Sequence, residues 1–279
     1  MEPERYAMSE AQNKEMFELF KKVGLTFEPL RITEKIDFGN DFHKTNDSDK
    51  FIDIKKATAE DIPLYEGKYI NQFVIKPDEI KYVIPRDFVE QKVKKNLNVY
   101  RIALRAVARA TDKRSLIATL LPPNTSSVHS LFSERNADQI SIKEKLFILG
   151  MLNSYVLDFR IRQLISMNIT KSAIKQLPIP NIKDIKDAEK IIQIVKELLK
   201  ENKGYYQDLD ELVPGNTYQD CSHDQLTAEL NARIMIDFNL TRQEIVMLMR
   251  TFESAKHMED VQEETQRILD CYDKLSEDK

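Results

Sequence analysis

Apolar positions follow a helical period at the start of the chain. The residues that set this period are Met16, Phe17, Phe20 and Val23. We therefore expect a first helix over about 9–23. Ser9 and Gln12 fit a capping box at its beginning, and Gly24 is expected to close the helix in the left-handed conformation.

Between Leu25 and Tyr100 the pattern changes to short segments rich in β-branched and aromatic residues, separated by prolines and polar turns. These segments are LTFEPLRI, KFIDI, KYINQFVI and IKYVI. A polar stretch at about 39–50 indicates a flexible insertion, and residues 86–96 predict one short helix between strands. In the region 101–121 the alanines favour a helix, whereas SLIATLLP favours the second arm of a hairpin, and we expect two strands.

The second half of the chain is predicted to be mostly helical. Ser141 and Glu144 form a capping-box pattern that begins one long helix reaching about residue 166, and the prolines of LPIP at 177–180 end this region. Two more capping boxes pair Ser222 with Gln225 and Thr241 with Glu244. We expect further helices at about 185–203, 223–236, 242–253 and 258–275, with a loop at 203–220.

These elements predict an α+β fold in which a β-rich domain with interleaved helices precedes an all-helical C-terminal region. We expect an N-terminal helix at 1–24, one domain at 25–180 and a helical domain at 181–279. The longest apolar stretches are shorter than the roughly 20 residues that a membrane helix requires, and the N-terminus lacks the apolar core of a signal peptide. The expected location is therefore the cytoplasm, with no membrane partner.

Charge is distributed unevenly, although the chain carries a net charge of only -4. Residues 204–279 hold 17 acidic and 7 basic side chains, whereas residues 92–114 hold eight Lys or Arg and one acid. A basic zone in an otherwise acidic chain favours a surface that binds a polyanion, although a merely solvated face gives the same composition.

Enzyme motifs are fragmentary. The tripeptide DFG at 37–39 lacks the other motifs of a kinase, and no methyltransferase catalytic loop, glycine-rich cofactor loop or paired metal-ligand spacing is present. We therefore expect no cofactor or metal in this chain. Asp78, Glu90 and Lys92 match the PD...ExK spacing of Mg²⁺-dependent nucleases, but that chemistry requires ExK on a strand, whereas the local sequence favours a helix.

Arg101, Arg105 and Arg109 share one face of either a helix or a strand. Arginine suits forked contacts to phosphates and to guanine, so these three residues are candidates for a DNA-binding stripe, with internal salt bridges as the alternative. Further candidates are polar or basic residues on neighbouring segments: Lys68, Asn71, Gln72, Lys113, Arg114, Asn124, Thr125, Ser126, His129, Arg160, Arg162, Asn168 and Lys171.

Five segments, in order, carry a resemblance to a known family: PLYEGKYINQF, YRIALRAVARATDKRSLIATLLPPN, HSLF, LGMLNSYVLDFRIRQ and KQLPIP. Together they resemble the TaqI-like C-terminal specificity domain of adenine-specific DNA methyltransferases of type II restriction-modification systems, over about residues 28–275. The resemblance implies sequence-specific recognition of double-stranded DNA. It also implies a separate methyltransferase or nuclease module, in cis or in trans, with S-adenosylmethionine bound by the methyltransferase module.

The leading hypothesis is thus a DNA target-recognition module without catalytic motifs of its own, a fragment or subunit of a restriction-modification enzyme that could also form a homodimer. One alternative is the Mg²⁺-dependent nuclease built on Asp78, Glu90 and Lys92. The other is a helical protein-interaction module in which the pair of helices around residues 230–249 binds protein.

Overall fold

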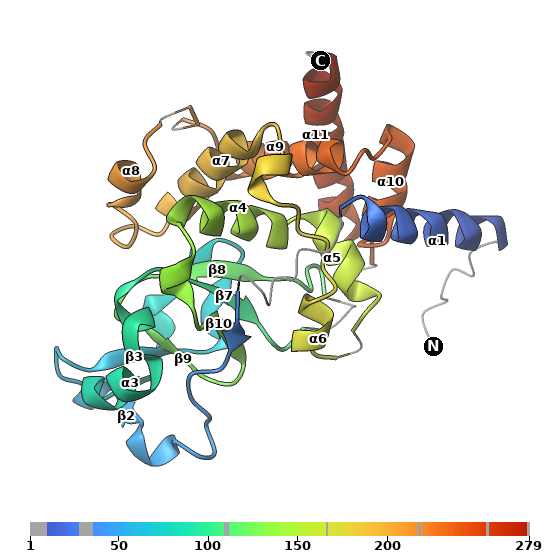
Figure 1. The fold of residues 1–279 in the computed structure, drawn as a ribbon. Coiled ribbons are helices and arrows are strands. Elements are labelled where there is room, and N and C mark those ends of the chain that lie inside the picture. The colour runs from blue at the N-terminus through green and yellow to red at the C-terminus, as the bar shows by residue number, and fades with distance from the viewer. Residues whose placement is uncertain are drawn as a thin grey trace.

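The chain has a mixed α+β architecture with a helical C-terminal stretch (Figure 1), as the sequence predicts. The structure is a computed structural model, and it describes residues 10–27, 36–108, 112–165, 167–215, 217–218, 220–254 and 257–277. Among these residues, no helix is both long enough and apolar enough to cross a membrane.

Three small sheets form the β-rich part. The first has the antiparallel order β1-β10-β7-β8, the second has the order β2-β6-β3-β9 with β3 and β9 parallel, and β4 pairs with β5. Their bounds are β1 (Phe38–Gly39), β2 (Ile52–Asp53), β3 (Ile62–Tyr65), β4 (Ile70–Asn71), β5 (Val74–Ile75), β6 (Tyr82–Ile84), β7 (Arg101–Arg105), β8 (Ala118–Leu121), β9 (Ser126–Ser127) and β10 (Leu131–Glu134).

The expected hairpin is confirmed, because β7 and β8 pair antiparallel from Arg101 opposite Leu121 to Leu104 opposite Ala118. The expected short helix between strands is α3 (Arg86–Val93). The polar insertion expected at about 39–50 is buried at its start and exposed in the rest. Residues 39–42 contribute the end of β1 and the buried residues Asp41 and Phe42, with Phe42 in the small core between α3 and the second sheet, whereas residues 43–50 are mostly exposed.

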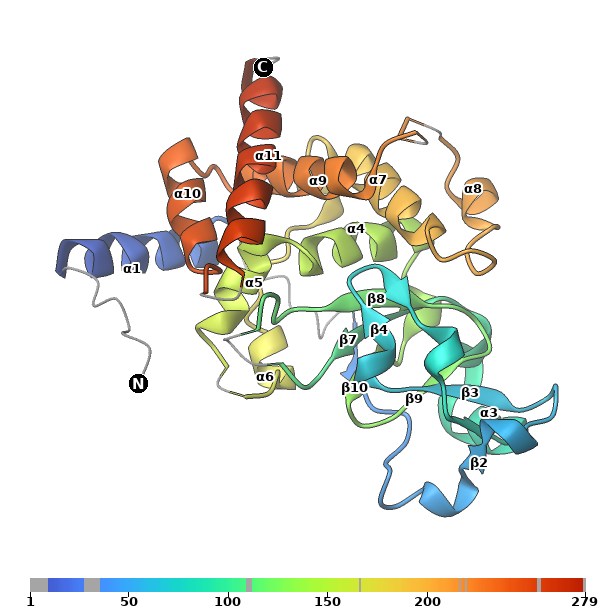
Figure 2. The ribbon, with the colours of Figure 1, turned by 180° about the vertical axis from the view of Figure 1, so that it is seen from behind.

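Helices cover one side of this β-rich part (Figures 1 and 2). The helices are α1 (Glu10–Leu25), α4 (Ile142–Leu152), α5 (Tyr155–Arg162), α6 (Lys171–Ile174), α7 (Ala188–Lys200), α8 (Leu209–Leu212), α9 (His223–Asp237), α10 (Arg242–Arg250) and α11 (Met258–Glu277). Those expected at 9–23, 185–203, 223–236, 242–253 and 258–275 are thus present with shifted ends, and α8 lies in the expected loop.

Two details of the helix prediction are wrong. The single helix expected from residue 141 is divided into α4 and α5, because Asn153 hydrogen-bonds to the backbone of Ala118 in β8 and Ser154 then caps α5. Gly24 does not end α1 in the left-handed conformation; it is helical, and a Cβ there would lie 2.9 Å from the Arg160 guanidinium. Ser9 lies outside the described residues.

The core is continuous across both predicted domain boundaries. One apolar cluster runs from Leu19 in α1 through Leu104 in β7 to Ile268 in α11. Gly150 in α4 lets α7 approach closely, because a Cβ there would lie 2.9 Å from the Val195 side chain. The helical region therefore packs directly on the β-rich region along the length of α4.

Candidate nucleic-acid interface

Arg101 is an internal residue, and the prediction that it belongs to an exposed stripe is wrong. Its side chain is 1% exposed, and its Nη1 lies 2.9 Å from Oδ2 of Asp41. Its other terminal nitrogen donates to the carbonyl of Thr125 at 2.8 Å, while the Ser126 hydroxyl donates to the same Asp41 carboxylate at 3.0 Å. A buried charge requires such a partner, so Arg101, Thr125 and Ser126 form a structural network.

Arg105 is half-buried at the end of β7. Its Nε donates to the carbonyl of Gly67 at 2.9 Å, and its Nη2 donates to the carbonyl of Ile70. Burial lowers the pKa of Arg105 from its ordinary value, with Asp112 acting in the opposite direction. The side chain thus holds the 67–70 turn against the sheet. Arg109 lies outside the described residues.

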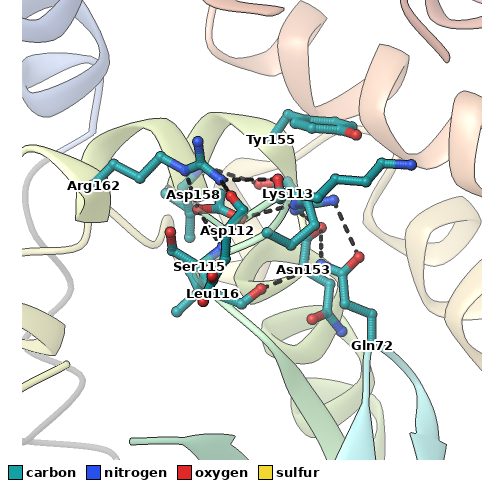
Figure 3. Close-up of polar contacts among 12 residues, drawn as sticks. Gln72, Asp112, Lys113, Ser115, Leu116, Asn153, Tyr155, Asp158 and Arg162 are labelled. Atoms are coloured by element: carbon teal, nitrogen blue, oxygen red, sulfur yellow. Dashed lines mark hydrogen bonds and ion pairs between the residues drawn. The ribbon is translucent and has the colours of Figure 1, made fainter. Parts of the chain in front are cut away.

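Arg114 and Arg162 converge on Asp158, whose side chain is fully buried. Figure 3 shows Arg162 and Ser115 beside Asp158. The Nε of Arg114 is 2.8 Å and the Nε of Arg162 is 3.3 Å from the Asp158 carboxylate, which also accepts the backbone N–H of Ser115. Burial alone would lower the pKa of Arg114, but the attraction of Asp158 and Tyr155 holds it above its ordinary value. Burial lowers the pKa of Arg162 despite Asp158.

The same network connects the hairpin to the helical region. Gln72 accepts a hydrogen bond from Arg114 and donates to the carbonyl of Asn153, while Lys113 forms an ion pair with Glu264 of α11 at 2.9 Å. Arg160 stacks on Phe20 and donates to its carbonyl. Of the predicted contacts, Gln72, Lys113, Arg114, Arg160 and Arg162 therefore have partners inside the protein.

Two other candidates lie at separate places. Asn124 is exposed in a left-handed turn (φ 59°) and accepts a hydrogen bond from Arg86, and Asn71 is exposed in β4.

The residues of the alternative nuclease site are not brought together on a strand. Glu90 and Lys92 lie on helix α3, where Lys92 forms an ion pair with Asp47 at 3.2 Å. No cluster of three His, Cys, Asp or Glu side chains suited to a metal ion occurs in the described part of the chain.

The remaining predicted residues, Lys68, His129, Asn168 and Lys171, are all exposed. They lie on segments that hydrogen-bond to one another around the end of the first sheet. The N–H of Gly67 donates to the hydroxyl of Ser130, and the N–H of Ala106 donates to the carbonyl of Ser130 at 3.0 Å. The N–H of Ile169 donates in turn to the carbonyl of Ala106 at 2.9 Å, just before α6.

We call these hydrogen-bonded segments the donor edge; besides predicted residues, they carry His43, Lys44, Val107 and Met167, which the sequence reasoning missed. Its exposed members are His43, Lys44, Lys68, Val107, His129, Met167, Asn168 and Lys171. The rings of His43 and His129 are nearly parallel with centroids 6.4 Å apart, and Glu66 forms ion pairs with Lys44 at 2.7 Å and Lys68 at 3.4 Å. His43 and Lys44 are adjacent basic residues within the polar insertion expected from the sequence. This basic pair is the sequence feature that could have indicated them as site residues.

Comparison of the sequence with protein-family models found no match, and a search of curated proteins found no similar sequence.

Proposed function

We propose that this chain is a DNA target-recognition module of a restriction-modification enzyme, acting with an adenine methyltransferase or nuclease module in cis or in trans. The observation that supports this proposal is the donor edge. Lys44, Lys68 and Lys171 project from three segments that are far apart in sequence, and Glu66 is the acidic residue paired within this set. Excess positive charge on one edge is what phosphate binding requires.

The internal arginines fit the same function in a different role. Arg101 ties Asp41 to the β9 segment, Arg105 holds the 67–70 turn, and Arg114 ties the hairpin to α5. These contacts fix the backbone of the segments that form the donor edge. In this proposal the arginines position the interface, and the exposed lysines, histidines and Asn168 contact DNA. S-adenosylmethionine would bind in the methyltransferase module, since this chain has no motif for it.

The test measures binding of the full chain, alone and joined to its methyltransferase module, to a pool of random duplexes at salt concentrations between about 50 and 200 mM. The test variant carries Lys44→Ala, Lys68→Ala and Lys171→Ala. The control variant removes the same charge elsewhere, by Lys55→Ala, Lys56→Ala and Lys81→Ala, which are exposed in the second-sheet region.

We expect the test variant to bind all duplexes more weakly. The slope of log affinity against log salt should become shallower by about 0.9 for each lost phosphate contact, because fewer counterions are released. The control variant should keep the wild-type slope. If the wild-type chain binds no duplex in either form, the proposed function is wrong; if it binds duplexes but the test variant keeps the wild-type slope, the donor edge is not the surface that binds DNA.

A further inference from the structure

The donor edge contains an apolar side chain beside a side-chain amide. Val107 is 56% exposed, whereas its neighbours Ala106 and Ala108 are buried, so the side chain of Val107 points away from the core. Val107 pairs with Asn168 in an isolated antiparallel bridge. Residues directly opposite each other in such a pair have their side chains on the same face, with Cβ atoms about 5 Å apart.

Neither side chain is used by the fold. Within the described residues, the exposed amide of Asn168 has no hydrogen-bond partner, and Val107 lies outside the apolar core clusters. The adjacent Met167 is 62% exposed. The side chains of Val107 and Asn168 are therefore both accessible to a ligand.

The backbone beneath the pair is well anchored. Ile169 is 2% exposed and donates to the carbonyl of Ala106, and Thr170 caps α6 by accepting the N–H of Ala173. On the other side, β7 is held by Arg105 and by pairing with β10. Two side chains fixed on paired backbone segments can present a defined pattern to a ligand.

We propose that Val107 and Asn168 together read one A·T base pair in the major groove, an inference that rests on the proposed function. An asparagine amide both accepts from adenine N6 and donates to adenine N7, and an apolar side chain contacts the 5-methyl group of thymine. One amide and one apolar group side by side therefore match the two distinguishing features of a single A·T pair. Lys68 and Lys171 contact the flanking phosphates.

The experiment begins by selecting, from a random duplex pool, the sequences that the full-length protein binds best, joined to its methyltransferase module if required. An A·T pair should be fixed in the selected site. That pair is then altered in two ways: deoxyuridine in place of thymidine removes the methyl group, and 7-deazaadenine removes the N7 acceptor.

The wild-type protein should lose about fourfold in affinity with deoxyuridine, as expected for loss of one methyl contact, and about tenfold or more with 7-deazaadenine. Val107→Ala should no longer respond to deoxyuridine but still respond to 7-deazaadenine, and Asn168→Ala should show the reverse. The matched controls Ile54→Ala and Asn98→Ala, at other exposed sites, should respond as wild type does. All four variants should keep the wild-type melting temperature within a few degrees.

The outcomes separate the two proposals. Duplex binding without a fixed A·T pair, or with both variants responding to the altered bases as wild type does, overturns the base-pair assignment and leaves the DNA-binding function standing. Absence of duplex binding by the wild-type protein overturns the proposed function itself.

Discussion

The role of Arg101 follows from its partner, Asp41, and not from its charge alone. Arg101 and Arg105 share one face of β7, and the surroundings of that face change along the strand and just beyond its end. It is covered by Asp41 and β9 at Arg101, half-covered at Arg105 and open at Val107. The same alternation would make an exposed stripe on a face open to solvent, but it makes an internal ion pair at Arg101 because the segments that carry Asp41 and Thr125 cover this face of β7.

The buried pair gives a stability prediction. Asp41→Asn keeps the shape of the side chain but leaves the Arg101 charge without a counterion in a buried site, which should lower the free energy of unfolding by about 3–5 kcal/mol. Urea denaturation measures the loss. Asp49→Asn, on the exposed part of the same segment, should change it by less than about 0.5 kcal/mol. A loss below about 1 kcal/mol for Asp41→Asn would show that the Asp41–Arg101 ion pair is not shielded from water.

The sequence predicts a side chain's chemistry better than its surroundings. The charges of Arg101 and Arg114 are evident from the chain, but their carboxylate partners are Asp41, 60 residues earlier, and Asp158, 44 residues later. No local pattern encodes either pairing. Lys68, His129 and Lys171 could be predicted as exposed because polar turns lie at the surface, whereas the joining of their segments through Ser130 and Ala106 depends on the tertiary fold.

At the scale of elements, helix starts are predictable and helix breaks are not. Ser222 and Thr241 form complete capping boxes as expected, because the capping groups lie within three residues of each other. The break between α4 and α5 lies in a continuous apolar pattern, and it arises because Asn153 satisfies the backbone of β8. Hydrogen bonds to the backbone of Ala118, which is distant in the sequence, thus interrupt a helix that the local pattern predicts to be continuous.

The attachment of α1 to α10 should depend on pH through Glu244. Partial burial would raise the pKa of Glu244, but the Lys22 ammonium and the Thr241 N–H and hydroxyl outweigh it and hold the pKa below 4.5. Since the folded-state pKa is depressed, Glu244 stabilises the protein above about pH 4.5, and this contribution is lost as the pH falls through the folded-state pKa.

Denaturation in urea at a series of pH values between about 6 and 3 tests this contribution. Glu244→Gln should be less stable than wild type at pH 6, and the difference should shrink towards pH 3 as wild-type Glu244 becomes protonated. Glu253→Gln, outside this contact, should parallel wild type throughout. A difference between Glu244→Gln and wild type that stays constant with pH would show that the carboxylate charge is not what holds the two helices.

At the scale of the whole molecule, packing joins regions that the sequence separates. The prolines at 177–180 and the change to acidic helices suggest a boundary, yet Ile191 and Val195 of α7 pack against α4, which itself covers β7 and β8. The contact is close because residue 150 is glycine. The helical region therefore supports the β7–β8 hairpin through α4, and the hairpin in turn supports the donor edge. We call α4, α7 and the hairpin together the frame.

Gly150→Val tests whether this frame unfolds as one unit. The added Cβ would lie 2.9 Å from Val195 and 3.0 Å from Ile191 side-chain atoms, which should cost about 1–3 kcal/mol of unfolding free energy by overpacking. In native-state hydrogen exchange followed by mass spectrometry, the opening free energies of β7–β8 and of α7–α9 should fall by equal amounts, because both depend on the α4 contact. Lys190→Val, at an exposed position of α7, should leave both unchanged. A loss confined to α7–α9 would instead show two units that open independently, and the helical region would then not contribute to the stability of the donor edge.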